Sequence, residues 1–226
     1  MIPLRDDNPS SSRPIVTWLI IATDVLIFTY MLTLGSEAAL NRFILAFAAI
    51  PGEITGRIGS APVSEYPTLI TSMFLHGGWL HLIGNMLYLW IFGDNVEDLM
   101  GHGGFLVFYL VTGLAAVWTH ILLNPGSRVP LIGASGAIAG VLGAYLVLFP
   151  RARILSLVPF GIFSRLVAVP AIFFLPFWFI LQLFSGLGSL RGEGAGVAFW
   201  AHVGGFVAGV VLVRLFARRR SVAGWP

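Results

Sequence analysis

Long runs of apolar residues, separated by short polar or glycine- and proline-rich stretches, constrain this chain more than any other feature. The first run, Ile15 to Leu34, is long enough to cross the hydrocarbon layer of a bilayer, which takes about 20 helical residues. Over the whole chain 57% of the residues are hydrophobic and only 10% are charged. A soluble domain carries about a quarter charged residues. The sequence therefore predicts an all-α, polytopic membrane protein.

We expect six transmembrane helices, which form a single bundle over residues 15–216. The five runs that follow the first are Trp79–Phe92, Phe105–Leu123, Ser135–Phe149, Leu166–Phe184 and Val197–Phe216. Pro170 and Pro176 predict a kink in the fifth helix. A polar turn is expected over Gly93–Gly104 and a glycine-rich loop over Gly186–Gly196.

The segments outside these runs are short, with one exception. Residues 1–14 are expected to form a polar N-terminal segment, and residues 217–226 a basic tail. The first loop, Gly35 to Leu75, is long and partly apolar. Within it, Glu37–Ile50 predicts an interfacial or partly inserted helix, and Thr68–Leu75 could begin the second span.

Arginine residues set the predicted orientation, because cytoplasmic loops of membrane proteins are enriched in basic residues. With the N-terminus inside, nine arginines face the cytoplasm and four face outward. The inner set is Arg5, Arg13, Arg151, Arg153, Arg165, Arg214, Arg218, Arg219 and Arg220, and the outer set is Arg42, Arg57, Arg128 and Arg191. Both termini are therefore expected in the cytoplasm. The use of arginine alone, with many Gly and Ala residues, favours a bacterial inner membrane.

Composition excludes several kinds of chemistry. The chain has no cysteine, so it has no disulfides, zinc–thiolate sites or iron–sulfur sites. All thirteen basic residues are arginine, which excludes lysine nucleophiles and Schiff bases. The formal charge of +3 does not favour nucleic-acid binding, because the arginines cluster at span ends and in the tail. We expect no cofactor and no metal.

The stretch Ile132–Gly140, Ile-Gly-Ala-Ser-Gly-Ala-Ile-Ala-Gly, contains the candidate nucleophile. Ser135 follows Gly133 and opens a helix on which Gly136 and Gly140 share one face. Small residues on one stripe let a second helix approach closely. A hydroxyl in the first helical turn also lies beside free N–H groups, which could form an oxyanion hole. The alternative is that these small residues only pack the helix and that the serine bonds to its own backbone.

Three predicted spans begin at the same membrane depth, and each start carries polar residues. His81 and Asn85 share a face of the second span, Ser135 opens the fourth, and His202 lies in the first turns of the sixth. The Gly205-xxx-Gly209 stripe lies on the His202 face, and it matches the Gly136-xxx-Gly140 stripe. We therefore expect the fourth and sixth helices to pack closely and to bring His202 to Ser135.

This arrangement favours hydrolysis by an activated serine. Histidine can take the serine proton near neutral pH, and His81 and Asn85 can supply donors to an oxyanion. No carboxylate is placed to orient His202, so a dyad is expected and not a triad. The α/β-hydrolase motif G-x-S-x-G is absent, because Ala137 takes the last glycine position. A metal site at His76, His81 and His202 is disfavoured, since H-E-x-x-H is missing.

These residues resemble the rhomboid family of intramembrane serine proteases. The similarity covers three blocks, which fall on the second, fourth and sixth spans: HGGWLHLIGN at 76–85, Gly133-Ala-Ser135-Gly136, and Ala201-His202-Val-Gly-Gly205 with Gly209. The resemblance implies a catalytic Ser135–His202 dyad. It also implies an oxyanion hole formed by His81, Asn85 and the backbone N–H groups of Ser135 and Ala134.

The resemblance further implies that the substrates are single-span or polytopic membrane proteins, cut near the outer end of a transmembrane helix, usually after a small residue. Glu97 resembles a structural carboxylate of the family that braces loops.

Two positions depart from the family pattern. Tyr66-Pro67 stands where Trp-Arg is common, and Ala139 stands where many members place an aromatic on the histidine ring. We therefore expect Phe206 or Trp200 to hold His202.

Two other functions remain open. A catalytically silent rhomboid-like protein could bind and retain membrane clients, although the intact set of Ser135, His202, His81 and Asn85 argues against it. A transporter or channel is disfavoured, because Asp24 is the only charged residue in the core of a predicted span. We expect Asp24 to pair with a donor on a neighbouring helix.

Overall fold

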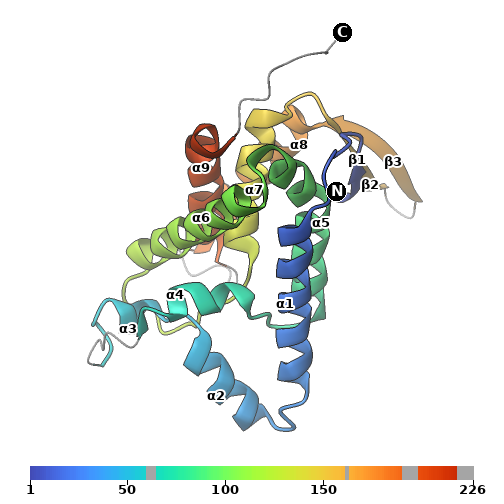
Figure 1. Ribbon diagram of the computed structural model, residues 1–226. Helices are drawn as coiled ribbons and strands as arrows, with labels where there is room; N and C mark the ends of the chain where they lie inside the picture. Colours follow the sequence, from blue (N-terminus) through green and yellow to red (C-terminus); the bar gives the residue numbers. More distant parts are fainter. Residues whose placement is uncertain (60–64, 161–162, 190–197, 218–226) are drawn as a thin grey trace.

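The computed structural model describes residues 1–59, 65–160, 163–189 and 198–217, and this part of the chain is mostly helical (Figure 1). The long helices are α1 (Ile15–Leu32), α5 (Trp79–Met100), α6 (His102–Leu123), α7 (Ser135–Leu148), α8 (Ala171–Ser189) and α9 (Phe199–Phe216). Helices α1, α6, α8 and α9 are long and apolar enough to cross a membrane. Helix α7 is apolar but has only 14 residues. The chain is a multi-pass membrane protein.

The long first loop contains short helices at one end of the bundle. They are α2 (Glu37–Phe47), α3 (Pro51–Ile54), α4 (Thr68–Thr71) and the 3₁₀ turn η2 (Ser72–Phe74). Ser36 caps the start of α2, because its hydroxyl accepts a hydrogen bond from the Ala39 N–H at 3.2 Å, and none of the helix residues is buried. The stretch Thr68–Leu75 does not begin the second span, because non-helical residues at 75–78 come before α5. In Figure 1 these elements lie at the end opposite the N-terminus.

A three-stranded antiparallel sheet lies at the other end of the bundle, beside the N-terminus (Figure 1). Its order is β1 (Ile2–Asp6), β2 (Arg153–Phe160), β3 (Phe163–Pro170), and Ile154 of β2 pairs with Asp6 on one side and Val169 on the other. The prediction that the fifth span begins at Leu166 is therefore wrong, and α8 begins at Ala171. Hydropathy cannot separate an apolar strand from the start of an apolar helix.

The expected breaks between helices are also corrected. Helix α5 continues to Met100, so most of the predicted polar turn at Gly93–Gly104 is helical, and the chain turns only at Gly101, whose φ is +71°. Pro170 ends β3, which leaves Pro176 as the proline inside α8. Helix α8 includes Gly186 of the predicted glycine-rich loop. Three predicted parts lie outside the described residues. They are the rest of that loop from residue 190, Val197 at the predicted start of the sixth span, and most of the basic tail.

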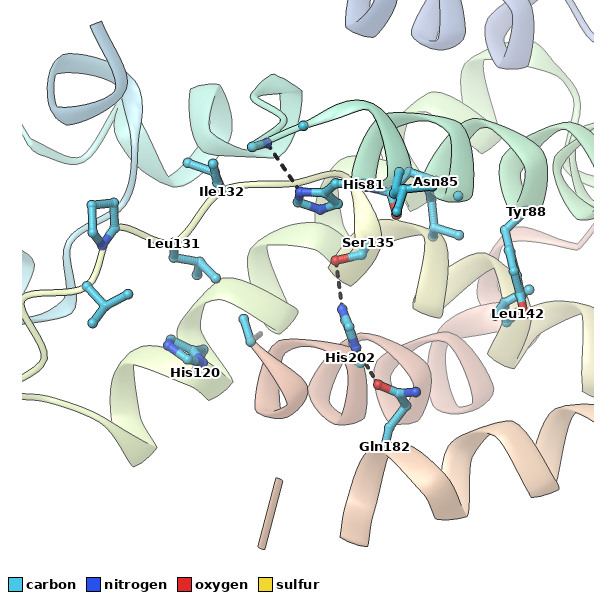
Figure 2. A pocket seen from close by; sticks show the side chains of 18 of the residues that line it. His81, Asn85, Tyr88, His120, Leu131, Ile132, Ser135, Leu142, Gln182 and His202 are labelled. Atoms are coloured by element: carbon cyan, nitrogen blue, oxygen red, sulfur yellow. Dashed lines mark hydrogen bonds between the residues drawn. The ribbon is translucent and has the colours of Figure 1, made fainter. Parts of the chain in front are cut away.

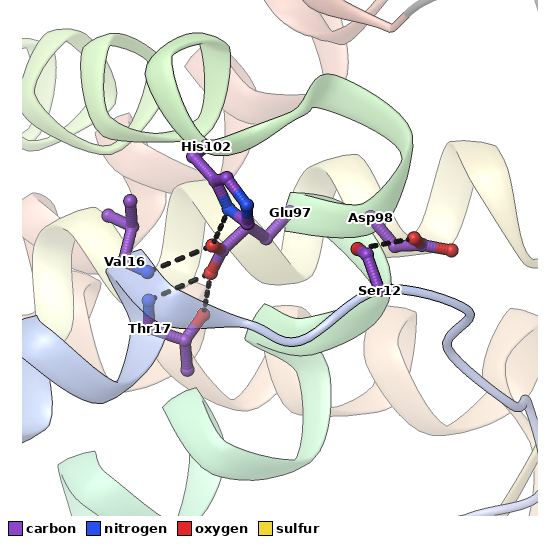
Figure 3. A network of polar contacts seen from close by, with 6 residues as sticks. All are labelled: Ser12, Val16, Thr17, Glu97, Asp98 and His102. Atoms are coloured by element: carbon purple, nitrogen blue, oxygen red, sulfur yellow. Dashed lines mark hydrogen bonds and ion pairs between the residues drawn. The ribbon is translucent and has the colours of Figure 1, made fainter.

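Glu97 explains why α5 extends past its apolar part (Figure 3). The carboxylate is fully buried and accepts hydrogen bonds from the N–H groups of Val16 and Thr17 at 2.9 and 2.8 Å and from the Thr17 hydroxyl at 2.7 Å. His102 Nδ1 lies 2.6 Å from the same carboxylate. The first N–H groups of a helix have no partner within the helix, so Glu97 satisfies those of α1. It joins the starts of α1 and α6 to the end of α5.

Asp24 does not pair as predicted. Its side chain is fully buried in α1, yet neither carboxylate oxygen has a hydrogen-bond partner among the described residues. The hydroxyl of Tyr109 on α6 interacts with Asp24 electrostatically but is also without a hydrogen bond there.

Helix α7 is the centre of the bundle. Every residue from Gly136 to Tyr145 is buried, and α5, α6, α8 and α9 all pack against it. Near its C-terminal end the Tyr145 hydroxyl donates a hydrogen bond to the Asp6 carboxylate of β1. The sheet is thus joined to the central helix by a polar contact.

The Asp6 contact predicts a pH-dependent stability. Burial raises the pKa of Asp6 to about 6. Between the unfolded value, about 4, and this raised pKa, the folded protein holds a proton that the unfolded chain releases, so stability falls as pH rises through that window. The melting temperature of Asp6→Asn in detergent, measured relative to that of wild type, should therefore rise as the pH increases from about 4.5 to about 7.5. A difference between the two proteins that stays constant with pH would contradict this expectation.

Candidate active site

Ser135 and His202 are in direct contact (Figure 2). Ser135 is the first residue of α7, and its Oγ lies 2.7 Å from Nε2 of His202 on α9. The first hydrogen bond of α7 runs from the Ile138 N–H to the Ala134 carbonyl, so the N–H of Ser135 has no partner within the helix. The hydroxyl thus lies between an imidazole nitrogen and the positive end of a helix.

Glycine contacts set the distance between the two helices. A Cβ added at Gly205 would lie 1.9 Å from the Gly136 carbonyl oxygen, and one at Gly209 would lie 2.0 Å from the Gly140 carbonyl oxygen. Real Cβ atoms do not approach an oxygen so closely, so α9 can reach the α7 backbone only with glycine at both positions. Gly136 and Gly140 have no space for side chains either, because α6 packs there through Ala116 and Thr112.

The His81 ring lies directly beside Gly133. A Cβ on Gly133 would lie 2.6 Å from His81 Nε2, and the Gly133 φ of +123° is one that other residues rarely adopt. The Gly77 N–H donates to His81 Nδ1 at 3.3 Å. In a neutral imidazole the other nitrogen then carries the proton, so His81 Nε2 is a donor on the Ser135 side of the ring.

Asn85 is held by a second histidine, which sequence reasoning left without a role. The buried His76 ring accepts a hydrogen bond at Nε2 from Asn85 Nδ2, and the two atoms are 3.0 Å apart. Burial lowers the pKa of His76 to about 4, so the ring is neutral at physiological pH. With Nε2 as the acceptor, His76 carries its proton on Nδ1. The amide of Asn85 has a second N–H, and Asn85 lines the same cavity as Ser135.

The candidate site opens into a cavity of about 1050 Å³. Ser135, His81 and His202 line it, together with apolar side chains such as Ile138 and Leu142. It extends to Asn124, Ser127 and Val129, in and beside the connection between α6 and α7. The space is large enough for several residues of an extended peptide and for water.

His202 is bounded by α8, which the sequence analysis did not place at the site. Gln182 Oε1 lies 2.7 Å from His202 Nδ1, and the Trp178 ring lies 6.0 Å from the imidazole between centroids. Phe199 of α9 meets the ring edge-on at 6.3 Å. Phe206 packs against Trp178 and Phe179 instead, so the expectation that it holds the imidazole is corrected. Trp200 is likewise not a ring neighbour of His202 in the described part of the chain.

One signal could have pointed to α8. Gln182 is the single glutamine of the chain, and it interrupts an otherwise apolar run. A polar side chain in a membrane span is costly and is a candidate functional residue. As for metals, no group of three or more His, Asp or Glu side chains suited to hold one is found among the described residues.

The fold and the site together define a multi-pass helical membrane protein with a hydrogen-bonded Ser–His pair at the start of its central helix. The model of the rhomboid domain matches residues 63–219, which is more than half of the chain. The chain belongs to the rhomboid family.

Several curated proteins are similar to this chain. Rhomboid protease GluP of Bacillus subtilis (strain 168) is 34% identical over 136 residues, which are 60% of this chain and 25% of that protein. Rhomboid protein 1, mitochondrial, of Saccharomyces cerevisiae is 37% identical over 100 residues, 42% of this chain and 29% of that protein. Putative rhomboid protease YdcA of Bacillus subtilis is 33% identical over 93 residues, 41% of this chain and 46% of that protein. The matched segments therefore span less than half of each relative.

The contact between α7 and α9 gives the prediction for this site. Gly205→Val should push α9 away from the Gly136 carbonyl, lowering the melting temperature and the rate of any Ser135-dependent reaction together. Overpacking typically costs about 1–3 kcal/mol, and a misplacement of about 1 Å can cost about 10²-fold in rate. Melting curves in detergent, with labelling of Ser135 by a serine-reactive probe, measure both effects.

The matched control is Gly103→Val. A Cβ at Gly103 meets nothing within 4 Å, so this variant should melt and react like wild type. Gly113, also on α6, is not a suitable control, because it has no space for a side chain. A Cβ there would lie 2.7 Å from the Met73 sulfur, and Gly113 is buried. A Gly205→Val protein indistinguishable from Gly103→Val would show that the helix contact does not limit the site.

Proposed function

We propose that this protein is an intramembrane serine endopeptidase that cuts membrane-protein substrates with a Ser135–His202 dyad. The observation that carries the proposal is the 2.7 Å contact between Ser135 Oγ and His202 Nε2 at a cavity large enough for a peptide. Family membership supports the same reaction, since several relatives carry the name of rhomboid protease. No cofactor or metal takes part.

In the first step, Ser135 Oγ attacks the carbonyl carbon of the scissile bond while its proton passes to His202 Nε2. The carbonyl oxygen becomes an oxyanion, and the donors proposed for it are His81 Nε2–H, the Asn85 amide and the Ser135 N–H. The Ala134 N–H, one residue earlier, is a further candidate donor. Such donors act most strongly where water is scarce, because they are already oriented before the charge develops.

In the second step, the C–N bond breaks and the proton on His202 passes to the leaving amine. The acyl group stays on Ser135 Oγ until water, deprotonated by His202, attacks the ester carbon and releases the carboxyl product. The cavity provides a route for that water, because it extends to Asn124 and Ser127 outside the helices. Serine and histidine return to their starting protonation states.

The proposed topology has six spans with both termini in the cytoplasm of a bacterium. Six described arginines, Arg5, Arg13, Arg151, Arg153, Arg165 and Arg214, favour the sheet end as the inner face. Ser135 lies ten residues before Tyr145, whose hydroxyl contacts β1, and ten residues of helix span about 15 Å. The nucleophile therefore lies within the bilayer, about 15 Å from the inner surface toward the outer one. Substrates would be cut toward the outer end of a transmembrane segment.

The alternative is a catalytically silent protein that binds membrane clients. It predicts no covalent reaction at Ser135. A fluorophosphonate probe needs only an activated serine and no knowledge of the substrate, so it separates the two functions. Labelling of wild type but not of Ser135→Ala would favour the enzyme.

The first functional prediction concerns the dyad. Ser135→Ala and His202→Ala should each abolish cleavage of a model single-span substrate in proteoliposomes, with melting curves close to wild type. Because both groups serve one step, the double variant should lose little more than either single variant. Substantial cleavage by either single variant would rule out the dyad.

The second concerns the oxyanion donors. His81→Ala and Asn85→Ala should lower kcat by a factor of about 10² to 10³ each, the usual effect of losing one such donor. His76→Ala should lower kcat by a smaller factor, because it removes the ring that holds the Asn85 amide in place. Steady-state rates at matched protein levels test this order. Rates of His81→Ala and Asn85→Ala equal to wild type would remove both residues from the oxyanion hole.

A further inference from the structure

Gln182 contacts the imidazole of His202 on the side away from Ser135 (Figure 2). Its Oε1 is 2.7 Å from His202 Nδ1, while Nε2 of the same ring is 2.7 Å from Ser135 Oγ. Serine, histidine and glutamine thus form one hydrogen-bonded chain that runs from α7 through α9 to α8. Both imidazole nitrogens are engaged.

The amide oxygen determines which nitrogen of His202 carries the proton. A carbonyl oxygen can only accept, so Nδ1 must donate to it. A neutral imidazole has a single N–H, and Nε2 is therefore left with a lone pair that faces the serine hydroxyl. This is the tautomer that a general base needs. With the proton on Nε2 instead, the ring would donate to Ser135 Oγ and could not take its proton.

The position of Gln182 is fixed by aromatic packing one helical turn away. Trp178 and Gln182 are four residues apart and share a face of α8, as His202 and Phe206 do on α9. Trp178 packs on the His202 ring, and Phe179 stacks on Phe206 with centroids 4.7 Å apart and an interplanar angle of 26°. These contacts join α8 to α9 and place the amide beside Nδ1.

We propose that Gln182 is a positioning residue that holds His202 in the base tautomer, so that the catalytic unit is Ser135–His202–Gln182. This inference rests on the proposed Ser135–His202 chemistry. Gln182 touches neither the reacting carbonyl nor Ser135 and acts through His202. When His202 takes the serine proton, both ring nitrogens donate, and the hydrogen bond from Nδ1–H to the amide becomes charge-assisted and stronger. An asparagine orients the histidine in cysteine proteases of the papain type in a comparable way.

The test compares two replacements of nearly the same length. Gln182→Met keeps an unbranched side chain of similar volume and removes the acceptor. Gln182→Glu keeps an acceptor oxygen at the same reach. Leu181→Met is the matched control, because Leu181 is the adjacent residue on α8 and is 47% exposed on the outside of the bundle. Melting curves in detergent establish that each variant is folded.

The tautomer of His202 is the decisive measurement, because it would not change if Gln182 had only a structural role. ¹⁵N-histidine NMR of the full chain in detergent micelles distinguishes Nδ1–H from Nε2–H, and the His202 signals are those that vanish in His202→Ala. Wild type, Leu181→Met and Gln182→Glu should show His202 protonated at Nδ1. Gln182→Met should show a population protonated at Nε2.

Kinetics give the second readout, with a model single-span substrate in proteoliposomes. Gln182→Met should lower kcat by about 10- to 100-fold, the range expected when a catalytic group is misplaced. KM should be unchanged, and Gln182→Glu should recover most of the rate. If Gln182→Met does not fold, Gln182→Asn replaces it with the same expected result, because its amide is one methylene too short to reach Nδ1.

A folded Gln182→Met with wild-type kcat, or with His202 still protonated only at Nδ1, would overturn the proposal. A wild-type protein with His202 protonated at Nε2 would overturn it as well, because the amide would then present its NH₂ group to the ring. A wild-type protein that shows the Nδ1 tautomer but neither cleaves nor reacts with a fluorophosphonate would refute the proposed protease function alone. The positioning role of Gln182 would then remain supported by the tautomer.

Discussion

The close approach of α9 to α7 is the contact on which the rest of the site depends. Gly205 and Gly209 lie directly over the carbonyl oxygens of Gly136 and Gly140, where a Cβ has no space. Lipid tails are as apolar as leucine, so the association of membrane helices depends on such packing more than on a hydrophobic driving force. One residue before Gly136 is Ser135, and three residues before Gly205 is His202. The same contact therefore sets both the helix spacing and the distance between serine and histidine.

Polar groups elsewhere in the bundle follow a second constraint, since each must find a partner where water is scarce. Glu97 satisfies the first N–H groups of α1, Asn85 is held by His76, and Gln182 by His202. Every one of these links joins segments that are distant in sequence or lie on different helices or loops. They fix helix ends and ring orientations that glycine packing alone leaves undetermined. The Asp24 carboxylate and the Tyr109 hydroxyl are among the buried groups that do not follow it, since neither has a hydrogen bond in the described part of the chain.

Helical periodicity allowed the sequence to place Ser135 and His202 at one depth and to align their glycine stripes, because residues three or four apart must share a face. Periodicity failed where the apolar pattern was not helical. The sequence predicts a span over Leu166–Pro170, because a strand beside a membrane is as apolar as a helix. The sequence predicts a turn over the acidic end of α5, because the groups on α1 that bind Glu97 are far away in sequence. The sequence does not place Gln182 and Trp178 at the site, because nothing local reveals which face of α8 meets His202.

The proposed chemistry suits a site built from neutral groups. Proton transfer from Ser135 to His202 creates a cation on the ring at the moment an oxyanion forms on the substrate, so the net charge does not change. The two charges attract each other strongly at low dielectric, and fixed dipoles can stabilise both. A permanent carboxylate on α8 would itself have to be paired or solvated in an apolar span. The amide of Gln182 supplies the direction of a hydrogen bond without that charge, which is the physical reason a glutamine can stand where soluble serine proteases place an aspartate.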